Sequence, residues 1–150
     1  MRMLIAALTL MPVALFAQSQ TAEDFMRMSQ IIVPDADADY PTVRCGAFYR
    51  SLHLVFDDEV LGTDGNDKMT QLEKLFTTTA ALVRQDDKQI SDTDAVAGVT
   101  ADVEALAGLY IERYRIAAQL GDNPFMNDPM LNEDNAFCTG LAKQIVASYD

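Results

Sequence analysis

Residues 41–61 read PTVRCGAFYRSLHLVFDDEVL, and this stretch decides the fold class. Its apolar side chains recur at spacings of three and four residues, the period of a helix with one buried face. The apolar positions are Cys45, Phe48, Leu52, Val55, Phe56 and Val60. The side chains expected on the opposite, outer side are Arg44, Arg50, Ser51, Asp57 and Asp58. The stretch therefore predicts an amphipathic helix over about 41–61 with a cysteine on its inner face.

The same periodicity continues in both directions along the chain. It predicts helices over about 21–33, 41–61, 67–86, 92–120 and 134–149. Ser91 and Asp94 have the spacing of a capping box, and Gly121 stands near the expected end of that helix. We expect an all-α, single-domain bundle of about five helices, covering residues 18–150.

The predicted 92–120 helix is apolar on two sides. One side carries Val96, Val99, Val103, Leu106, Tyr110 and Tyr114, and the other carries the small residues Ala97, Ala101, Ala105 and Gly108. A helix that is apolar on two sides usually lies at the centre of a bundle, which is what we expect here. The alternative is that the small residues form a homodimer contact, so both a monomer and a homodimer remain open.

Cys45 and Cys138 are the only cysteines, 93 positions apart, and both lie on apolar helix faces. Redox pairs usually stand close together as Cys-x-x-Cys, and two thiols with one histidine are too few for a structural zinc site. An even cysteine count in an exported protein favours a structural disulfide. We therefore predict a Cys45–Cys138 disulfide, no metal site and no cofactor.

This disulfide constrains the topology. In an up-down bundle the 41–61 and 134–149 helices run antiparallel, which places their N-terminal ends, and hence the two cysteines, far apart. The connection over 121–133 is long enough to carry the chain back along the bundle. The other solution is a last helix that packs across the others, and both solutions remain open.

Residues 1–17 have the layout of a secretory signal peptide. Arg2 precedes an apolar run of 14 residues, and polar Gln18-Ser19-Gln20 follows. The run is shorter than the ~20 residues of a spanning helix, and no later stretch approaches that length, so we expect no stable membrane span after signal removal. We predict cleavage after residue 17 or 19 and a periplasmic or secreted protein of a Gram-negative bacterium. The alternative is an uncleaved anchor.

The chain is acidic, with 23 Asp and Glu against 11 Lys and Arg, a formal charge of −12. Removal of residues 1–17 takes away only Arg2 and leaves −13. Binding to nucleic acid or to an anionic lipid surface depends on clustered Lys and Arg, which this sequence lacks. We therefore exclude nucleic acid as a partner and expect, if any, a protein of the cell envelope.

Catalytic and metal-binding patterns are weak. His53, the only histidine, is expected at the surface, paired with Asp57 one turn away, although a proton donor or a haem ligand is the functional alternative. Asp35, Asp37 and Asp39 resemble the start of a calcium loop. The pattern fails because its sixth and twelfth positions are Tyr40 and Gly46. With no Gly-x-Ser-x-Gly motif either, we expect no catalytic residues and no enzyme.

The segment between the last two predicted helices is unusually apolar for a loop. Its large apolar side chains are Phe125, Met126, Met130 and Leu131. These side chains either close the end of the bundle or form a contact surface for a partner.

Two segments, VRCGAFYR at 43–50 and AFCTGL at 136–141, resemble small exported helical proteins of proteobacteria. The resemblance implies an exported all-helical protein and no particular activity. The layout is also similar to that of periplasmic acid-stress chaperones, which are small and all-helical with one disulfide. We expect a non-enzymatic binding or accessory module of the cell envelope. An acid-responsive chaperone and a carrier of a small molecule or haem are the alternatives.

Overall fold

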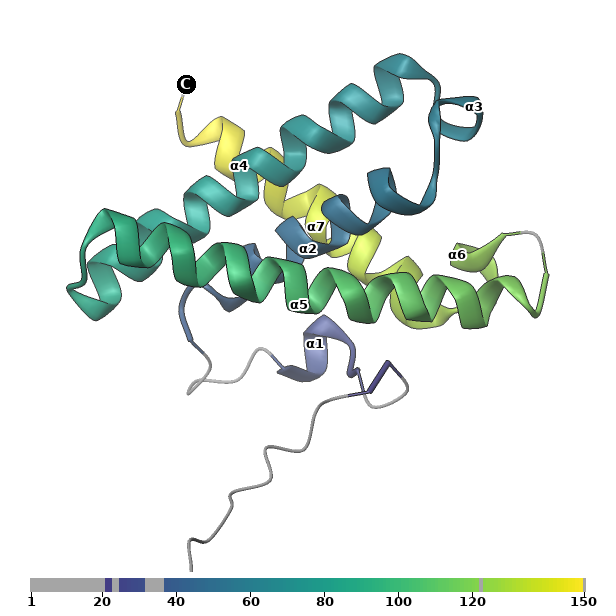
Figure 1. Ribbon diagram of the computed structural model, residues 1–150, viewed down its shortest axis with the longest axis horizontal. Helices are drawn as coiled ribbons and strands as arrows, with labels where there is room; N and C mark the ends of the chain where they lie inside the picture. The colour runs from purple at the N-terminus through teal and green to yellow at the C-terminus, as the bar shows by residue number, and fades with distance from the viewer. Residues whose placement is uncertain (1–20, 23–24, 32–36, 122, 150) are drawn as a thin grey trace, which may run out of the picture.

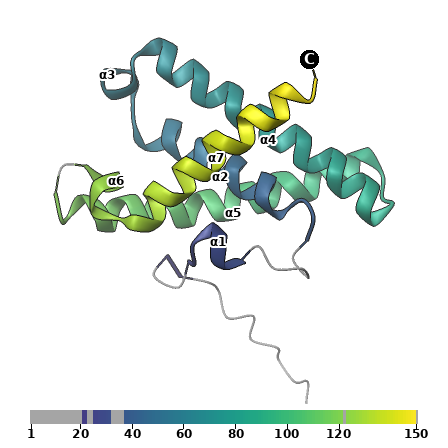
Figure 2. The same cartoon turned by 180° about the vertical axis from the view of Figure 1, so that it is seen from behind.

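Helix α2 (Tyr40–Val55) lies at the centre of the computed structural model, which describes residues 21–22, 25–31, 37–121 and 123–149. Helix α5 (Asp92–Ala118) passes α2 on one side, and α7 (Pro129–Ala147) crosses it on the other (Figures 1 and 2). Ten of the 16 residues of α2 are buried as a result.

The described residues form helices and contain no strand, which confirms the all-α class. The remaining helices are α1 (Met28–Ile31), α3 (Asp58–Leu61), α4 (Thr63–Lys88) and α6 (Pro124–Asn127). None of the helices in the described part combines the length and the apolar character needed to cross a bilayer. The predicted signal peptide over 1–17 lies outside the described residues.

The predicted 41–61 helix is broken in two. Helix α2 ends at Val55, Phe56 is extended, and α3 begins after Asp57. The Asp57 carboxylate accepts hydrogen bonds from the backbone N–H groups of Glu59 and Val60, at 3.1 and 3.2 Å. An aspartate that caps a new helix competes with continuation of the old one, and this is the physical reason for the break. Val60 is consequently 67% exposed, so its predicted inner position is wrong.

Three other boundaries differ from the sequence prediction. Helix α4 begins at Thr63 and not near residue 67, because Gly62, with φ of +70°, completes the turn before it. Helix α7 begins at Pro129, because proline suits the first helical position and Asp128 caps the Met130 N–H at 2.9 Å. In the predicted 21–33 helix, the described residues are helical only over Met28–Ile31.

Helix α2, and not α5, is the central helix. On α5 the side with Val99, Val103, Tyr110 and Tyr114 is buried, whereas the small residues at 97, 101, 105 and 108 are exposed. Gly46 explains the central place of α2, because a Cβ built there would lie 3.3 Å from Thr77 Oγ1 and 3.4 Å from a Val103 methyl. The missing side chain lets α2 approach α4 and α5 closely at the same point. The homodimer alternative for the small residues stays a prediction.

The disulfide between Cys45 and Cys138 is present, with the two Cα atoms 5.4 Å apart. It joins α2 to α7, two helices that cross in the views from front and back (Figures 1 and 2). Of the two topologies left open by the sequence, the last helix packs across the others. Both cysteines are completely buried, as their apolar faces predicted, whereas Tyr149 at the end of the predicted 134–149 helix is exposed.

Candidate functional site

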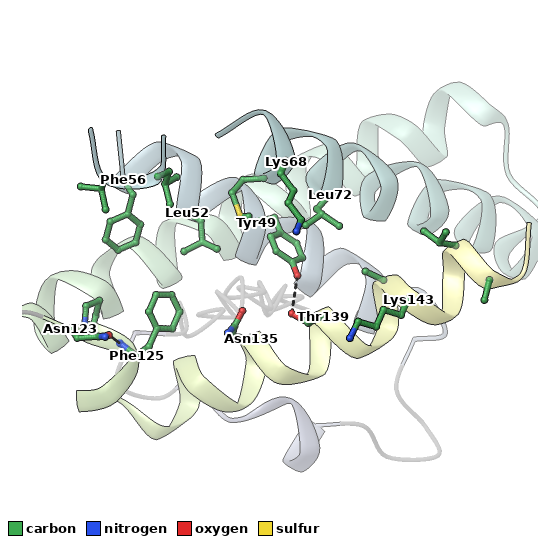
Figure 3. Close-up of a pocket in the computed structure, with 17 residues that line it drawn as sticks. Tyr49, Leu52, Phe56, Lys68, Leu72, Asn123, Phe125, Asn135, Thr139 and Lys143 are labelled. Atoms are coloured by element: carbon green, nitrogen blue, oxygen red, sulfur yellow. Dashed lines mark hydrogen bonds between the residues drawn. The ribbon is translucent and has the colours of Figure 1, made fainter. Parts of the chain in front are cut away.

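An apolar pocket of about 850 Å³ lies between two walls of helices (Figure 3). One wall comes from α2, α3 and the start of α4, and the other from α6 and α7. Its lining residues are Tyr49, Leu52, Phe56, Val60, Leu61, Lys68, Met69, Leu72, Asn123, Pro124, Phe125, Asn135, Thr139, Ala142, Lys143, Val146 and Ala147. This volume falls within the ~300–1,000 Å³ of small-molecule sites.

The disulfide holds the two walls together. Tyr49 stands one helical turn after Cys45 on α2, and Ala142 stands one turn after Cys138 on α7, and both line the pocket. A covalent bond one turn from the lining fixes the spacing of α2 and α7 at this point. The pocket is therefore built by the tertiary crossing that the disulfide secures.

A small polar group lies among the apolar side chains. The hydroxyl groups of Tyr49 and Thr139 are 3.5 Å apart across the two walls. The Tyr49 ring stacks on Phe76 of the core, with centroids 5.7 Å apart. Burial raises the pKa of Tyr49, and the Thr139 hydroxyl partly offsets that effect. Tyr49 is thus a neutral hydrogen-bonding group at neutral pH.

The charge of the pocket is opposite to that of the chain. Two of its 17 lining residues, Lys68 and Lys143, are basic and none is acidic, although the chain has 23 Asp and Glu. The lysines come from opposite walls, Lys68 from α4 and Lys143 from α7. Apolar walls with a few polar and charged groups are typical of binding sites for small organic molecules.

The four large apolar residues between the last two predicted helices lie in different environments. Part of this segment is helical. Phe125 lines the pocket and packs edge-on against Phe48, with ring centroids 6.3 Å apart. Met130 and Leu131 are buried in the core, whereas Met126 is 83% exposed. Met130 and Leu131 are therefore part of the core. A partner contact at Met126 remains a prediction.

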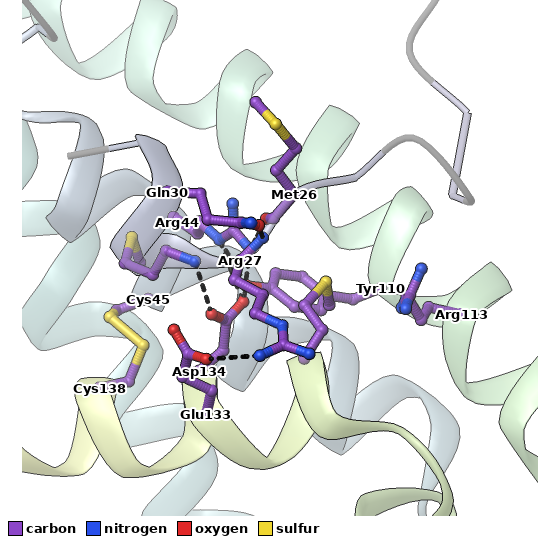
Figure 4. Close-up of polar contacts among 12 residues, drawn as sticks. Met26, Arg27, Gln30, Arg44, Cys45, Tyr110, Arg113, Glu133, Asp134 and Cys138 are labelled. Atoms are coloured by element: carbon purple, nitrogen blue, oxygen red, sulfur yellow. Dashed lines mark hydrogen bonds and ion pairs between the residues drawn. A yellow bond between two sulfur atoms is a disulfide. The ribbon is translucent and has the colours of Figure 1, made fainter. Parts of the chain in front are cut away.

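A second group of polar residues is completely buried at the crossing of α2 and α7 (Figure 4). Arg44 Nη2 lies 2.6 Å from Asp134 Oδ2, and the Tyr110 hydroxyl donates to the same oxygen at 2.5 Å. The N-terminal segment completes the group, because Arg44 Nη2 donates to the Met26 carbonyl at 2.5 Å and the Met28 N–H donates to Asp134 Oδ1 at 3.2 Å.

The ionic groups of this cluster satisfy one another. Burial opposes the charge on Arg44, but Tyr110 and Asp134 more than compensate and raise the pKa of Arg44. Burial, followed by the Asp134 carboxylate, raises the pKa of Tyr110 well above its ordinary value. Because neither Arg44 nor Asp134 reaches solvent, we interpret the cluster as a support of the fold that ties the segment around Met28 to α2 and α7.

The sequence prediction placed Arg44 and Ser51 on the outer side of their helix, and the structure shows both buried. Helical periodicity assigns an arginine to the surface because a buried guanidinium needs a partner that periodicity does not reveal. The sequence did contain one indication that Arg44 has a buried acidic partner. Asp134 stands one turn before Cys138 and Arg44 directly precedes Cys45, so the disulfide brings an acid and a base together.

The other candidates are also placed by the structure. His53 Nε2 lies 2.6 Å from Glu73 Oε2 of α4, so the predicted partner Asp57 is wrong. Asp39 pairs with Arg84 at 2.6 Å and Asp37 with Lys88 at 3.6 Å, whereas Asp35 lies outside the described residues. Within the part of the chain that is described, no three His, Cys, Asp or Glu side chains are grouped to hold a metal ion.

Comparison with models of known protein families gave no match to this chain. Searches of curated proteins and of solved structures gave no match either. The site is therefore interpreted from its own geometry.

Proposed function

We propose that this protein is an exported, non-enzymatic binding protein of the cell envelope, and that the pocket between α2, α4 and α7 is its binding site. Export rests on the signal-like residues 1–17, and the Cys45–Cys138 disulfide is compatible with an oxidising compartment. Of the roles considered from the sequence, the carrier of a small molecule is the one that the pocket supports best.

The observation that carries this proposal is the pocket itself. Its 850 Å³ are lined by side chains from five helices, and its two walls are joined by a disulfide. Val60 and Val146, both exposed, line it as well. Covering such apolar surface with a ligand removes it from water at ~25 cal/mol per Å², which is the driving force we expect for binding.

Binding is favoured over catalysis by the chemistry of the lining. Among the lining residues there is no carboxylate, imidazole or thiol. Nucleophilic and acid–base catalysis depend on such groups, usually paired within hydrogen-bond reach. Hydroxyl, amide and ammonium groups on apolar walls can orient a ligand without these reactions.

The test is whether an uncharged apolar molecule binds in this pocket. We expect decanol to bind the disulfide-bonded protein with 1:1 stoichiometry and to shift NMR signals of the lining residues. A Thr139→Trp variant places a large ring beside Tyr49 and should abolish binding. Gln144→Trp is the matched control, because Gln144 is exposed on α7 and does not line the pocket. Unchanged decanol binding by Thr139→Trp, or no binding by the wild type, refutes the proposed site.

A further inference from the structure

We propose that the natural ligand of this pocket is a long-chain alkyl carboxylate, with its head group held between Lys68 and Lys143. This inference rests on the proposed function and adds the chemical class of the ligand. It follows from the distribution of charge over the described residues.

Seven of the ten lysines and arginines in the described part of the chain pair with a carboxylate of the protein. The six arginines among them each lie within 4.0 Å of a carboxylate, and Lys88 pairs with Asp37. Lys68, Lys74 and Lys143 form no ion pair with the described residues, and two of these three line the pocket. In a chain with a twofold excess of acids, two lysines that line one pocket without an ion-pair partner mark a place where an external anion is favourable.

The two lysines converge on the polar part of the pocket. Figure 3 shows Lys68 reaching from α4 toward the Tyr49 hydroxyl, and Lys143 lying along α7 with its nitrogen on the side of Thr139. These hydroxyl groups supply neutral donors beside the two ammonium groups. A head group placed here meets positive charge from both walls.

Three large apolar side chains of the lining lie to one side of this polar part, together with the amides of Asn123 and Asn135. Leu52, Phe56 and Phe125 gather there in Figure 3, away from Lys143. A molecule with one anionic end and one apolar chain matches this division. An uncharged hydrocarbon leaves the two ammonium groups without a partner, and a cationic amphiphile is repelled by them.

A carboxylate fits this head-group site better than a phosphate. Two ammonium groups, one on each wall, match the two oxygens of a carboxylate. The lining contains no arginine, so the head group is held by the two ammonium charges and the hydroxyl groups. The pocket is therefore assigned to a single-chain carboxylate of the fatty-acid type.

The experiment compares four probes of equal chain length below their critical micelle concentrations. Decanoate, decyl phosphate, decanol and decyltrimethylammonium are titrated into the disulfide-bonded protein by calorimetry. We expect decanoate to bind about tenfold more tightly than decanol, which corresponds to ~1.4 kcal/mol. Decyl phosphate should bind less tightly than decanoate, and the cation least. Higher salt should reduce the preference for decanoate, because the head-group contact is electrostatic and lies near the surface.

Neutral lysine variants locate the head group. Lys68→Gln and Lys143→Gln should each weaken decanoate binding by about threefold to tenfold and weaken decanol binding less, because decanol carries no charge. Lys74→Gln is the matched control, since Lys74 is an unpaired lysine of α4 that does not line the pocket, and it should have no effect.

The outcomes separate the two proposals. Equal binding of decanol and decanoate, tighter binding of decyl phosphate, or an unchanged preference in Lys68→Gln/Lys143→Gln refutes the carboxylate assignment and leaves the binding site standing. If an acidic amphipathic helical peptide displaces decanoate at lower concentration than decanoate itself requires, the occupant is a protein segment and the assignment also fails. No binding of any alkyl probe refutes the proposed function together with this inference.

Discussion

Arg44 of α2 and Asp134 of α7 form an ion pair that is completely buried, with Nη2 and Oδ2 2.6 Å apart. The pair lies beside the Cys45–Cys138 disulfide, as Figure 4 shows, so one covalent and one ionic contact join the same two helices. These contacts fix the crossing of α2 and α7 on which the pocket depends.

Removal of one partner of this pair should be costly. We expect Arg44→Met to lower the free energy of unfolding by about 3–5 kcal/mol, because it leaves the Asp134 carboxylate buried without its cation. The double variant Arg44→Met/Asp134→Leu should lose less than Arg44→Met alone, since no buried charge remains. Urea unfolding measures both. Arg115→Ala, which breaks the exposed pair with Glu112, is the control and should change nothing measurable.

The disulfide should support both stability and binding. Cys45→Ala/Cys138→Ala should lower the free energy of unfolding by about 2–5 kcal/mol, because the closed loop no longer restricts the unfolded chain. At a temperature where this variant is still folded, decanol binding should weaken, since α2 and α7 are no longer held at a fixed spacing. Unweakened binding would mean that the remaining contacts alone hold the walls of the pocket.

The glycines of α2 and α5 should respond oppositely to alanine. Gly46→Ala should destabilise the protein by about 1–3 kcal/mol, because its Cβ crowds Thr77 and Val103. The Thr77 hydroxyl donates to the Glu73 carbonyl at 2.8 Å and cannot yield freely. Gly108→Ala should instead stabilise by ~1 kcal/mol, because a Cβ there has no neighbour within 4 Å and alanine is the better helix former. Thermal unfolding of both variants tests the contrast, which disappears if α2 does not pack closely against α4 and α5.

Alkaline pH should destabilise the fold. Burial raises the pKa of Tyr49, Tyr110 and Tyr114, whereas tyrosine in the unfolded chain ionises near pH ~10. Above that pH the unfolded chain binds fewer protons than the native state, so stability falls as pH rises toward the native pKa values. Below it the contribution is complete. Urea unfolding from about pH 8 to about pH 11 should show constant stability that begins to decline near pH ~10, with a smaller decline in Tyr114→Phe. A flat profile contradicts the buried tyrosines.

Export can be tested directly on the expressed full chain. We expect the protein in the periplasmic fraction of a Gram-negative host to begin at Gln18 or Gln20, after loss of the signal-like segment. Intact mass and non-reducing peptide mapping would show the new N-terminus and the linked Cys45 and Cys138 peptides. An uncleaved chain in the membrane fraction would support the anchor alternative instead.

The sequence by itself determined the helical class, the disulfide and the positions of the longer helices. Apolar residues at spacings of three and four specify helices locally, whatever the tertiary contacts. Ser91 was recognisable as a cap because its side chain bonds to the N–H of Asp94, three residues away, at 3.1 Å. The inward thiols of Cys45 and Cys138 were recognisable because each lies on an apolar face.

Only the tertiary structure decided which helix is central and where the buried charges lie. Arg44 was assigned to the surface because its partners, Asp134 and Tyr110, stand 90 and 66 positions away in the sequence. His53 pairs with Glu73 of the neighbouring helix and not with Asp57, for the same reason. The pocket, too, is assembled from residues 49–147, and no local pattern contains it. Periodicity reports which side of a helix is apolar, but pairing and cavities depend on how helices cross, and here α7 crosses α2 at the disulfide.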